Sequence, residues 1–353
     1  MNQTATHTPT KTTRPGGKPR DAYGELKQRV KDAGLLAKAP GYLFTKMALN
    51  AVLLAIGIGV LFATDLWWVQ VINALFLGFV FGQFGFIAHD AGHRQAFATP
   101  RQNDVAGLIH TTLLIGMGYG WWLEKHNAHH ANPNAIDLDP DIDIPVLAFS
   151  TEDALEKKGI ARAIVRQQHR WFFPVLLLQA IHLRVETVKW LLREPTWRYR
   201  NLEWVLFALF HVIGLGLVFW ALPWPLAIVF VLIQQAFFGA YLASVFAPNH
   251  KGMLLIHPED DYDFLHKQVL TARNVKASPV VDFWYGGLNY QIEHHLFPTM
   301  GRIHLRKAQK IIRAFCEDQG ITYYETSVLQ SYREILDVLR EVSKPLREEP
   351  RPA

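Results

Sequence analysis

Residues 282–298 read DFWYGGLNYQIEHHLFP and contain two adjacent histidines beside a glutamate, directly after a Gly-Gly pair. Two upstream stretches repeat this pattern: residues 89–93 read HDAGH, and residues 126–130 read HNAHH. In the first two stretches the histidines are three or four residues apart, and Gln291 stands at the same spacings from His294 and His295. Residues at these spacings share one face of a helix. Each stretch is therefore expected to aim its polar side chains at one point.

The rest of the sequence predicts a membrane protein. The chain has 353 residues, half of them apolar, and a net charge of +5. Its apolar residues are concentrated in long runs, four of which reach the roughly 20 residues that a membrane-spanning helix needs. The predicted fold is therefore an all-α integral membrane protein with four transmembrane helices in two hairpins. The expected spans are residues 43–63, 67–88, 202–222 and 226–246.

Several other segments are expected to lie at the membrane surface. Residues 107–122 are apolar but short and glycine-rich, which favours a re-entrant or interfacial segment over a full crossing. Residues 22–39 and 302–315 resemble basic amphipathic helices, and residues 171–192 form a partly apolar helix. The predicted domains are a disordered basic tail (1–22), a membrane domain (23–320) and a charged C-terminal extension (321–353).

The distribution of positive charge predicts the topology. The turns at residues 64–66 and 223–225 contain no Lys or Arg, whereas the N-terminal tail, the middle segment and the C-terminal region contain nearly all of them. The positive-inside rule assigns these three regions to the cytoplasmic side. With four spans, both termini and all three histidine stretches then lie on that face. The sequence thus predicts a cytoplasmic, histidine-rich cap that holds two metals.

Eight histidines are candidates for a shared metal site, which is too many for one zinc ion with its four ligands. Imidazole nitrogens suit iron, zinc, copper or nickel, and iron is favoured if the chemistry involves oxygen. Carboxylates that accept the other ring N–H would orient the rings. Asp139 and Asp141 either have this role or are ordinary solvated loop residues. The candidate metal ligands are His89, His93, His126, His129, His130, His250, His294 and His295, with Asp90 and Glu293 as possible ligands or supporting groups.

The three histidine stretches, their order and the four-span layout resemble the integral-membrane fatty acid desaturases. The HxxxH, HxxHH and QxxHH boxes of that family match residues 89–93, 126–130 and 291–295. The context GGLNYQIEHHLFP is especially similar to the front-end and linoleoyl-CoA-type branch, in which glutamine replaces the first histidine of the third box. The resemblance covers roughly residues 40–320.

This resemblance implies a di-iron enzyme that uses O2 and two external electrons to insert a cis double bond into an acyl chain. It also implies that the Asn-His pair after the last span belongs to the metal site, with His250 as a ligand and Asn249 as a water-mediated contact. Gln291 stands where stearoyl-type relatives have histidine. Its amide oxygen either binds iron weakly or orients a ligand.

The resemblance also implies partners. Many front-end desaturases carry a fused haem electron-donor domain, for which the segment before the first span is too short. The single cysteine, Cys316, excludes both an intramolecular disulfide and a cluster held by four cysteines of this chain. The expected partners are a separate electron donor of ferredoxin or cytochrome type with its reductase, a fatty acyl substrate linked to CoA, a carrier or a lipid, and membrane lipid. No nucleic-acid partner is expected.

Two alternatives compete with desaturation. A hydroxylase of the same superfamily, acting on an alkane, carotenoid or sphingoid chain, would use the same boxes. A zinc-binding or transport protein would use histidines for ion passage, but it would place them within the spans rather than at their ends. The remaining histidines lack paired spacing and are interpreted as interfacial or packing residues: His110, His169, His182, His211, His257, His266 and His304.

Overall fold

The computed structural model describes residues 21–348, and over this range the chain is almost entirely helical. The only strands in that range are the two-residue β1 (Asn274–Val275) and β2 (Glu325–Thr326), which pair in parallel. The disorder predicted for the N-terminal tail falls on residues 1–20, which lie outside the described residues. Asp21 and Ala22, at the end of that predicted tail, belong to the start of the first helix, where Asp21 is the N-cap.

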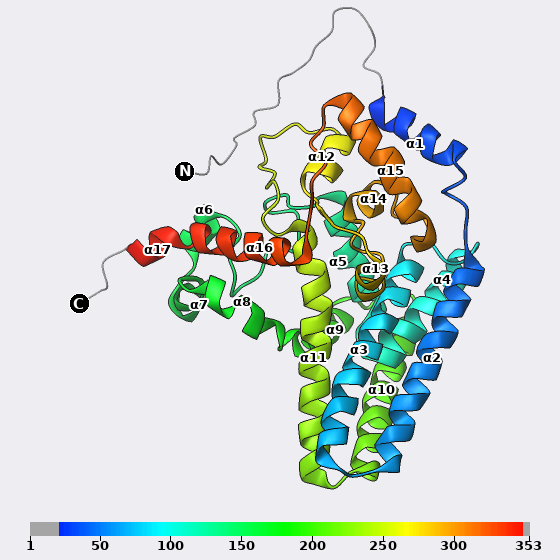
Figure 1. The fold of residues 1–353 in the computed structure, drawn as a ribbon. Helices are drawn as coiled ribbons and strands as arrows, with labels where there is room; N and C mark the ends of the chain where they lie inside the picture. The colour runs from blue at the N-terminus through cyan, green and yellow to red at the C-terminus, as the bar shows by residue number, and fades with distance from the viewer. Residues whose placement is uncertain (1–20, 349–353) are drawn as a thin grey trace, which may run out of the picture.

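Four long helices form a bundle (Figure 1). They are α2 (Pro40–Ala63), α3 (Trp67–Gly92), α10 (Arg200–Ala221) and α11 (Trp224–His250), and each is long and apolar enough to cross a membrane. This confirms the predicted all-α membrane fold with four spans in two hairpins. The helices α3 and α11 run four residues beyond their predicted spans. The added turn of α3 begins with His89 and is followed directly by His93, and the added turn of α11 ends at His250, so both spans deliver ligand candidates to the same end of the bundle.

Helix α3 is the central helix of the bundle, and small residues let α11 approach it closely. A Cβ atom added to Gly78 would lie 2.9 Å from the backbone oxygen of Gln234, and one added to Gly82 would overlap the ring of Tyr241. Close backbone approach through small residues is typical of helix packing in membranes. The outer faces of α2 and α10 expose large apolar side chains, including Val52, Ile56 and Val212, which suit a lipid environment.

A cap of short helices covers the end of the bundle where α3 and α11 finish (Figure 1). It contains α1 (Ala22–Asp32), α12 (Phe264–Leu270), α13 (Pro279–Trp284), α14 (Gln291–Leu296) and α15 (Arg302–Gln319). Leu26 and Val30 of α1 are fully buried in one cluster with Ile312 and Phe315 of α15. The apolar face of α1 is thus covered by protein, in contrast to the expected position of this helix near the headgroups.

The segment between the first hairpin and the second histidine box does not form a spanning helix. It consists of α4 (Pro100–Gly107), the π-helix η1 (Leu108–Leu113) and α5 (Tyr119–Ala131). The short α4 begins with a capping box formed by Thr99 and Gln102. The break between η1 and α5 includes Gly116, whose φ of 65° favours glycine.

A lateral lobe extends sideways from the bundle (Figure 1). It consists of α6 (Thr151–Glu156), α7 (Gly159–Val165), α8 (Gln168–Leu176), α16 (Val328–Val342) and α17 (Lys344–Glu348), and α9 (Gln179–Arg193) joins it to the bundle. Helices α8 and α9 meet at a bend of 74°. Ile335 and Leu339 of α16 pack with Phe172 and Leu176 of α8. Most of the predicted C-terminal extension is therefore a folded part of this lobe.

Candidate metal centre

All eight candidate histidines come together where the bundle meets the cap. They arrive on four elements: the C-terminal end of α3, the helix α5, the last residue of α11, and α14. Two groups have ligand atoms within 4.8 Å of one another, namely His89, His93, His126 and His294, and His129, His250 and His295. The eighth, His130, lies between them: its Nε2 is 3.2 Å from Nε2 of His126 and 3.1 Å from Nε2 of His294, and its ring stacks on that of His295.

In the second group, hydrogen bonds fix which ring nitrogen carries the proton. Nδ1 of His129 lies 3.0 Å from Asp139, Nδ1 of His250 lies 2.9 Å from the carbonyl of Thr271, and Nδ1 of His295 lies 2.8 Å from Oε1 of Gln268. Each partner atom is an acceptor, so each Nδ1 donates and each Nε2 keeps a lone pair.

The Nε2 lone pairs of this group face one another without a proton between them. The two Nε2 atoms of His129 and His250 are 3.3 Å apart, and Nε2 of His295 is buried with no hydrogen-bond partner. A cation in their midst resolves this arrangement, and metal-bound histidines typically donate the other ring N–H to a carboxylate or carbonyl. The donor set therefore fits a metal ion.

The first group has the same character. Nε2 of His126 lies 2.8 Å from Nε2 of His93, and Nε2 of His89 is buried without a partner. Trp122 stacks on the ring of His126 with centroids 4.6 Å apart, and it fills the space over Gly92 that a Cβ would occupy. An aromatic side chain thus packs against this group of imidazoles, in addition to the carboxylate of Asp90 beside His89.

Burial favours the neutral form of four candidate histidines on α5 and α14. The pKa of His126, His130, His294 and His295 is well below its usual value, first because burial disfavours the charged ring and then because neighbouring imidazoles repel a second charge. Neutral imidazole is the form that binds metals. The site is therefore ready to bind cations without first losing protons at neutral pH.

The sequence allows two interpretations of Asp139 and Asp141: that they orient a histidine ring, or that they are ordinary solvated loop residues. The first applies to Asp139, whereas Asp141 is closer to the second. Asp139 is buried, accepts from His129 Nδ1 and from the backbone N–H groups of Asn134 and Asp141, and so orients a ring of the cluster. Burial alone would raise the pKa of Asp139, but the hydrogen bonds that it accepts from His129 and Asn134 and the nearby positive charge of Lys251 outweigh this effect and keep its pKa below the usual value. Asp141 is partly exposed and pairs with Lys125, although one of its oxygens also lies 3.5 Å from His129 Nδ1.

The amides of Gln291 and Asn249 line the same site. Gln291 Nε2 lies 2.9 Å from Nε2 of His250, and Gln291 Oε1 accepts from Asn249 Nδ2. Oδ1 of Asn249 is buried without a partner. Both amides are therefore close enough to orient His250 or a ligand bound beside it.

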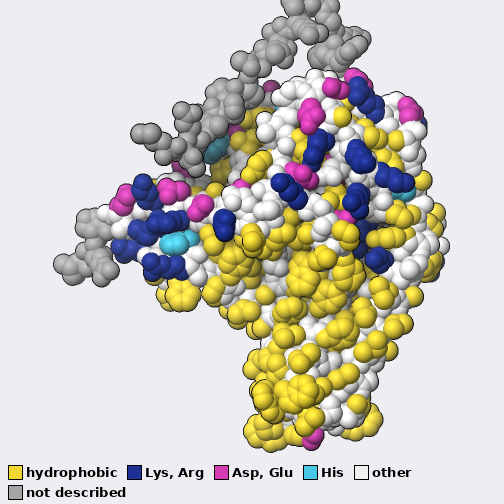
Figure 2. Space-filling model, viewed as in Figure 1, with side chains coloured by type: hydrophobic (Ala, Val, Ile, Leu, Met, Phe, Trp, Pro, Cys, Tyr) yellow, Lys and Arg dark blue, Asp and Glu magenta, His cyan; other side chains and the backbone are white. Residues whose placement is uncertain are grey.

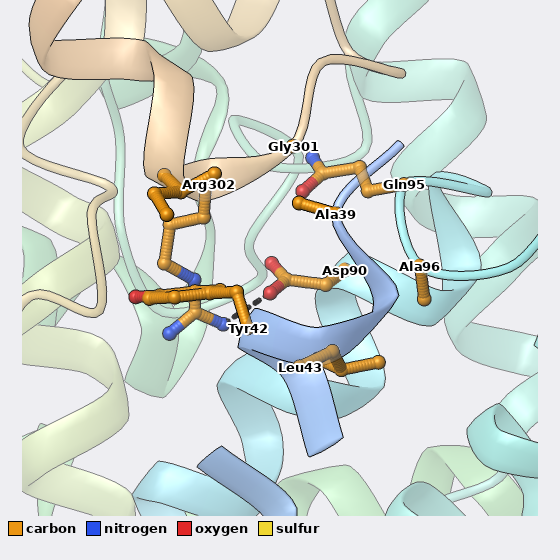
Figure 3. A pocket seen from close by; sticks show the side chains of 9 residues that line it. Ala39, Tyr42, Leu43, Asp90, Gln95, Ala96, Gly301 and Arg302 are labelled. Carbon is orange, nitrogen blue, oxygen red and sulfur yellow. Dashed lines mark hydrogen bonds and ion pairs between the residues drawn. The ribbon is translucent and has the colours of Figure 1, made fainter. Parts of the chain in front are cut away.

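Asp90 and Glu293 lie behind the histidines. Figure 3 shows the guanidinium of Arg302 beside the ring of Tyr42 and bonded to Asp90, across a small cavity next to Gln95. Asp90 also lies 3.6 Å from His89 Nδ1. Glu293 is buried and accepts from Asn274 and Tyr323, and burial raises its pKa to about 7. The carboxylate of Glu293 thus links α14 to Asn274 and Tyr323 elsewhere in the chain.

One buried acid that supports the site was not among the predicted site residues. Glu203, near the start of α10, is fully buried and accepts from the backbone N–H groups of Tyr119 (2.7 Å) and Gly120 (3.0 Å), and from Trp197. Helix α5 begins at Gly118 without a side-chain cap of its own. Glu203 therefore caps, from another helix, the element that carries three candidate ligands. Its only signal in the sequence is a lone acid at the edge of a predicted span.

The side chains of three other histidines of the described residues have local partners outside the cluster. His110 and His211 approach backbone carbonyls of their own helical segments, at 2.8 Å each, and His266 pairs with Asp263. These contacts fit the packing and interfacial interpretation. His169 lies on the lateral lobe, among arginines.

Comparison with known proteins identifies the family. The fatty acid desaturase family profile matches residues 66–327. The chain is 30% identical to a Delta(6)-fatty-acid desaturase of Caenorhabditis elegans over 343 residues, covering 92% of this chain and 75% of that protein. It is 28% identical to a Delta(8)-fatty-acid desaturase of Helianthus annuus (94% and 75% coverage), and 29% identical to a Delta(5) fatty acid desaturase of C. elegans (92% and 75%). Together with the four spans and the three histidine boxes, these matches show that the chain belongs to the fatty acid desaturase family.

Proposed function

We propose that this protein is a membrane fatty acyl desaturase that uses O2 and two electrons to insert a cis double bond into an acyl chain. The observation that carries the proposal is the meeting of eight imidazoles from four elements, and three of these rings have their Nδ1 protons committed to acceptors. The printed activities of the relatives support the substrate class.

We propose two iron ions as the cofactor. His89, His93, His126 and His294 would hold one ion, and His129, His250 and His295 the other, with His130 between them. Bound iron supplies the activation of O2 and the removal of hydrogen from the acyl chain. Eight nitrogens and no thiolate favour iron over the sulfur-rich sites typical of structural zinc.

The chain's own residues orient the rings and exclude water. Asp139, the carbonyl of Thr271 and Gln268 each hold one Nδ1 proton, which keeps the corresponding Nε2 free to bind metal. Six of the eight histidines are buried and the other two, His126 and His130, are partly exposed, so the protein around them would shield much of the reactive oxygen chemistry from water. We propose that Gln291 and Asn249 orient His250 and a bound water.

We propose that the electrons come from a separate protein of ferredoxin or cytochrome type, together with its reductase. The single cysteine of the sequence supports this, because a cluster with four thiolate ligands needs more. The acyl substrate would be linked to CoA, a carrier or a lipid. The positive-inside rule supports a cytoplasmic location for both termini and the histidine boxes.

The experiment is fatty acid profiling of a host that expresses the chain, with double bonds located by mass spectrometry. The relatives are named for Delta(5), Delta(6) and Delta(8) positions, so the double-bond position is itself a readout. A new unsaturated fatty acid is expected with the intact chain and not with His294→Ala, which should also lose bound iron. A hydroxylated product would instead identify the hydroxylase of the same superfamily.

The matched control is His169→Ala, because His169 lies outside the cluster on the lateral lobe. This variant should make the product and keep its iron. Loss of both would contradict the assignment of the ligands. Zinc alone in catalytically active preparations would contradict the di-iron proposal and favour a zinc-binding protein.

A further inference from the structure

A group of basic side chains gathers on the lateral lobe from two regions of the sequence. Arg166 and Arg170 lie at the end of α7 and in α8, whereas Arg340, Lys344 and Arg347 lie in α16 and α17. We call these five residues the lobe basic surface. Figure 2 shows Lys and Arg side chains collected on this lobe, with acidic side chains toward its upper edge.

The lobe basic surface has no acidic counterpart within the part of the chain that the structure describes. Across residues 21–348, none of its members forms an ion pair with a carboxylate. Arg347 donates only to oxygens of the lobe itself: the carbonyls of Arg166 and Arg340 and the hydroxyl of Ser343. The positive charges therefore repel one another unless an anion lies beside them.

The environment of His169, a histidine on the same lobe, shows the same excess of positive charge. The pKa of His169 is lowered by burial first, and then by the positive charges of Arg347, Arg170 and Arg340. No carboxylate is among the groups that act on it. The local excess of positive charge is thus a property of the folded lobe rather than of one sequence run.

The helices α7 and α8 of the same lobe also expose large apolar side chains. Ile160 of α7 is 82% exposed and Trp171 of α8 is 53% exposed. The adjoining α9 exposes Ile181, Val185 and Leu192 at helical spacing. In Figure 2 the hydrophobic side chains at the lower rim of the lobe lie close to the apolar surface of the bundle, below the basic side chains.

The basic helices of the cap, α1 and α15, differ from the lobe because their apolar faces are covered by protein. The apolar faces of α1 and α15 are buried against each other, with Leu26, Val30, Ile312 and Phe315 fully enclosed. On the lobe, by contrast, basic and exposed apolar side chains lie next to each other. An exposed tryptophan and exposed aliphatic residues on helices that also carry arginines suit the boundary between acyl chains and headgroups.

We propose that the lobe basic surface binds the phosphate groups of anionic phospholipids in the membrane leaflet on the cap side of the bundle, while Ile160 and Trp171 insert among the acyl chains. Arginine forks match phosphate oxygens, and clustered Lys and Arg next to a membrane are typical of anionic lipid binding. An acidic soluble protein would match the charge of this surface but would leave the side chains of Ile160 and Trp171 in water.

The experiment measures lipid retention by the full chain. The protein is purified in detergent, mixed with equal amounts of phosphatidylglycerol and phosphatidylcholine, and analysed by native mass spectrometry. The variant carries Arg166→Gln, Arg170→Gln and Arg340→Gln, and keeps Arg347 because its side chain bonds to lobe oxygens. The intact chain should retain phosphatidylglycerol preferentially. In the variant, the ratio of retained phosphatidylglycerol to retained phosphatidylcholine should fall by about tenfold.

The matched control removes three exposed charges from the cap, by Lys27→Gln, Lys31→Gln and Lys307→Gln. This variant should retain phosphatidylglycerol like the intact chain. Equal retention by the lobe variant, or an equal loss in the control, would overturn the proposal. Unchanged lipid retention with slower turnover at low concentrations of the electron donor would also overturn it, and would assign the surface to protein docking. The readout needs no turnover, so it is independent of the proposed desaturation.

Discussion

At the scale of single residues, the site depends on which nitrogen of each imidazole carries the proton. Asp139 holds the Nδ1 proton of His129 with a carboxylate, while Thr271 and Gln268 hold those of His250 and His295 with neutral oxygens. The carboxylate has the largest effect, because a buried anion both fixes the tautomer and raises the basicity of the ring toward a metal.

Asp139→Asn should therefore lower metal affinity or turnover by about 10- to 100-fold, as is typical for partners of metal-bound histidines. The substitution conserves shape but removes the charge that faces His129. Metal content by elemental analysis and product yield by mass spectrometry measure the effect. Asp137→Asn, on an exposed residue two positions earlier, should change neither. If both variants behaved alike, Asp139 would have no specific role in holding the ring.

At the scale of elements, the helix α5 depends on the rest of the molecule for its start. Gly118 offers no side chain to cap it, and its own N–H bonds to Thr187 of α9 at 2.7 Å. Glu203 of α10 satisfies the next two N–H groups. The negative charge of Glu203 also lies near the positive, N-terminal end of the helix dipole, where it is stabilising. The register of α5, and with it the position of three histidines, is thus fixed from two neighbouring helices.

Glu203→Gln should loosen the first turn of α5, since an amide offers one acceptor oxygen where the carboxylate offers two. The expected loss of unfolding free energy is about 2 kcal/mol, the range for a lost cap with a charged acceptor. Hydrogen exchange at Tyr119 and Gly120 should accelerate, and bound metal should fall. Glu186→Gln, which removes a partly exposed surface acid of α9, should leave all three measurements unchanged. Unaltered exchange in Glu203→Gln would exclude a capping role.

At the scale of the whole molecule, the candidate metal centre connects parts that are otherwise separate. The spans α3 and α11, the loop-borne α5 and the cap helix α14 contribute to it together. Eight imidazole rings in close contact have little reason to stay together except through what they bind. A bound metal stabilises the folded state in proportion to how far its concentration exceeds its Kd.

Removal of metal by a chelator should therefore lower the thermal midpoint of the purified protein, and ferrous iron should restore it. Metal at 100 times its Kd contributes about 2.7 kcal/mol. A thermal melt in detergent, with and without chelator, measures the shift. His294→Ala should melt lower than the intact chain and respond less to both treatments. An intact chain indifferent to chelation would argue that packing alone maintains the histidine cluster.

Much of this architecture could be predicted from residue patterns. Apolar runs of about 20 residues can only be stable as helices in a membrane, because every backbone group must find its partner within the segment. The spacing of His89 with His93, and of His126 with His129 and His130, is local geometry that any helix imposes. The four spans and the grouping of histidines within each box are therefore properties of short sequence segments.

Only the tertiary structure decided the contacts between distant segments. The pairing of His129 with Asp139 rather than Asp141, the capping of α5 by Glu203 and the burial of α1 against α15 each depend on where separate helices pack. Burial then gives these contacts their strength, since a carboxylate or imidazole enclosed by protein interacts far more strongly than one in water. The sequence by itself determined the spans and the ligand types, because these depend on hydrophobicity and helical periodicity. The fold decided which polar groups hold those ligands in position, because helical periodicity does not encode which side chains meet across loops and between separate helices.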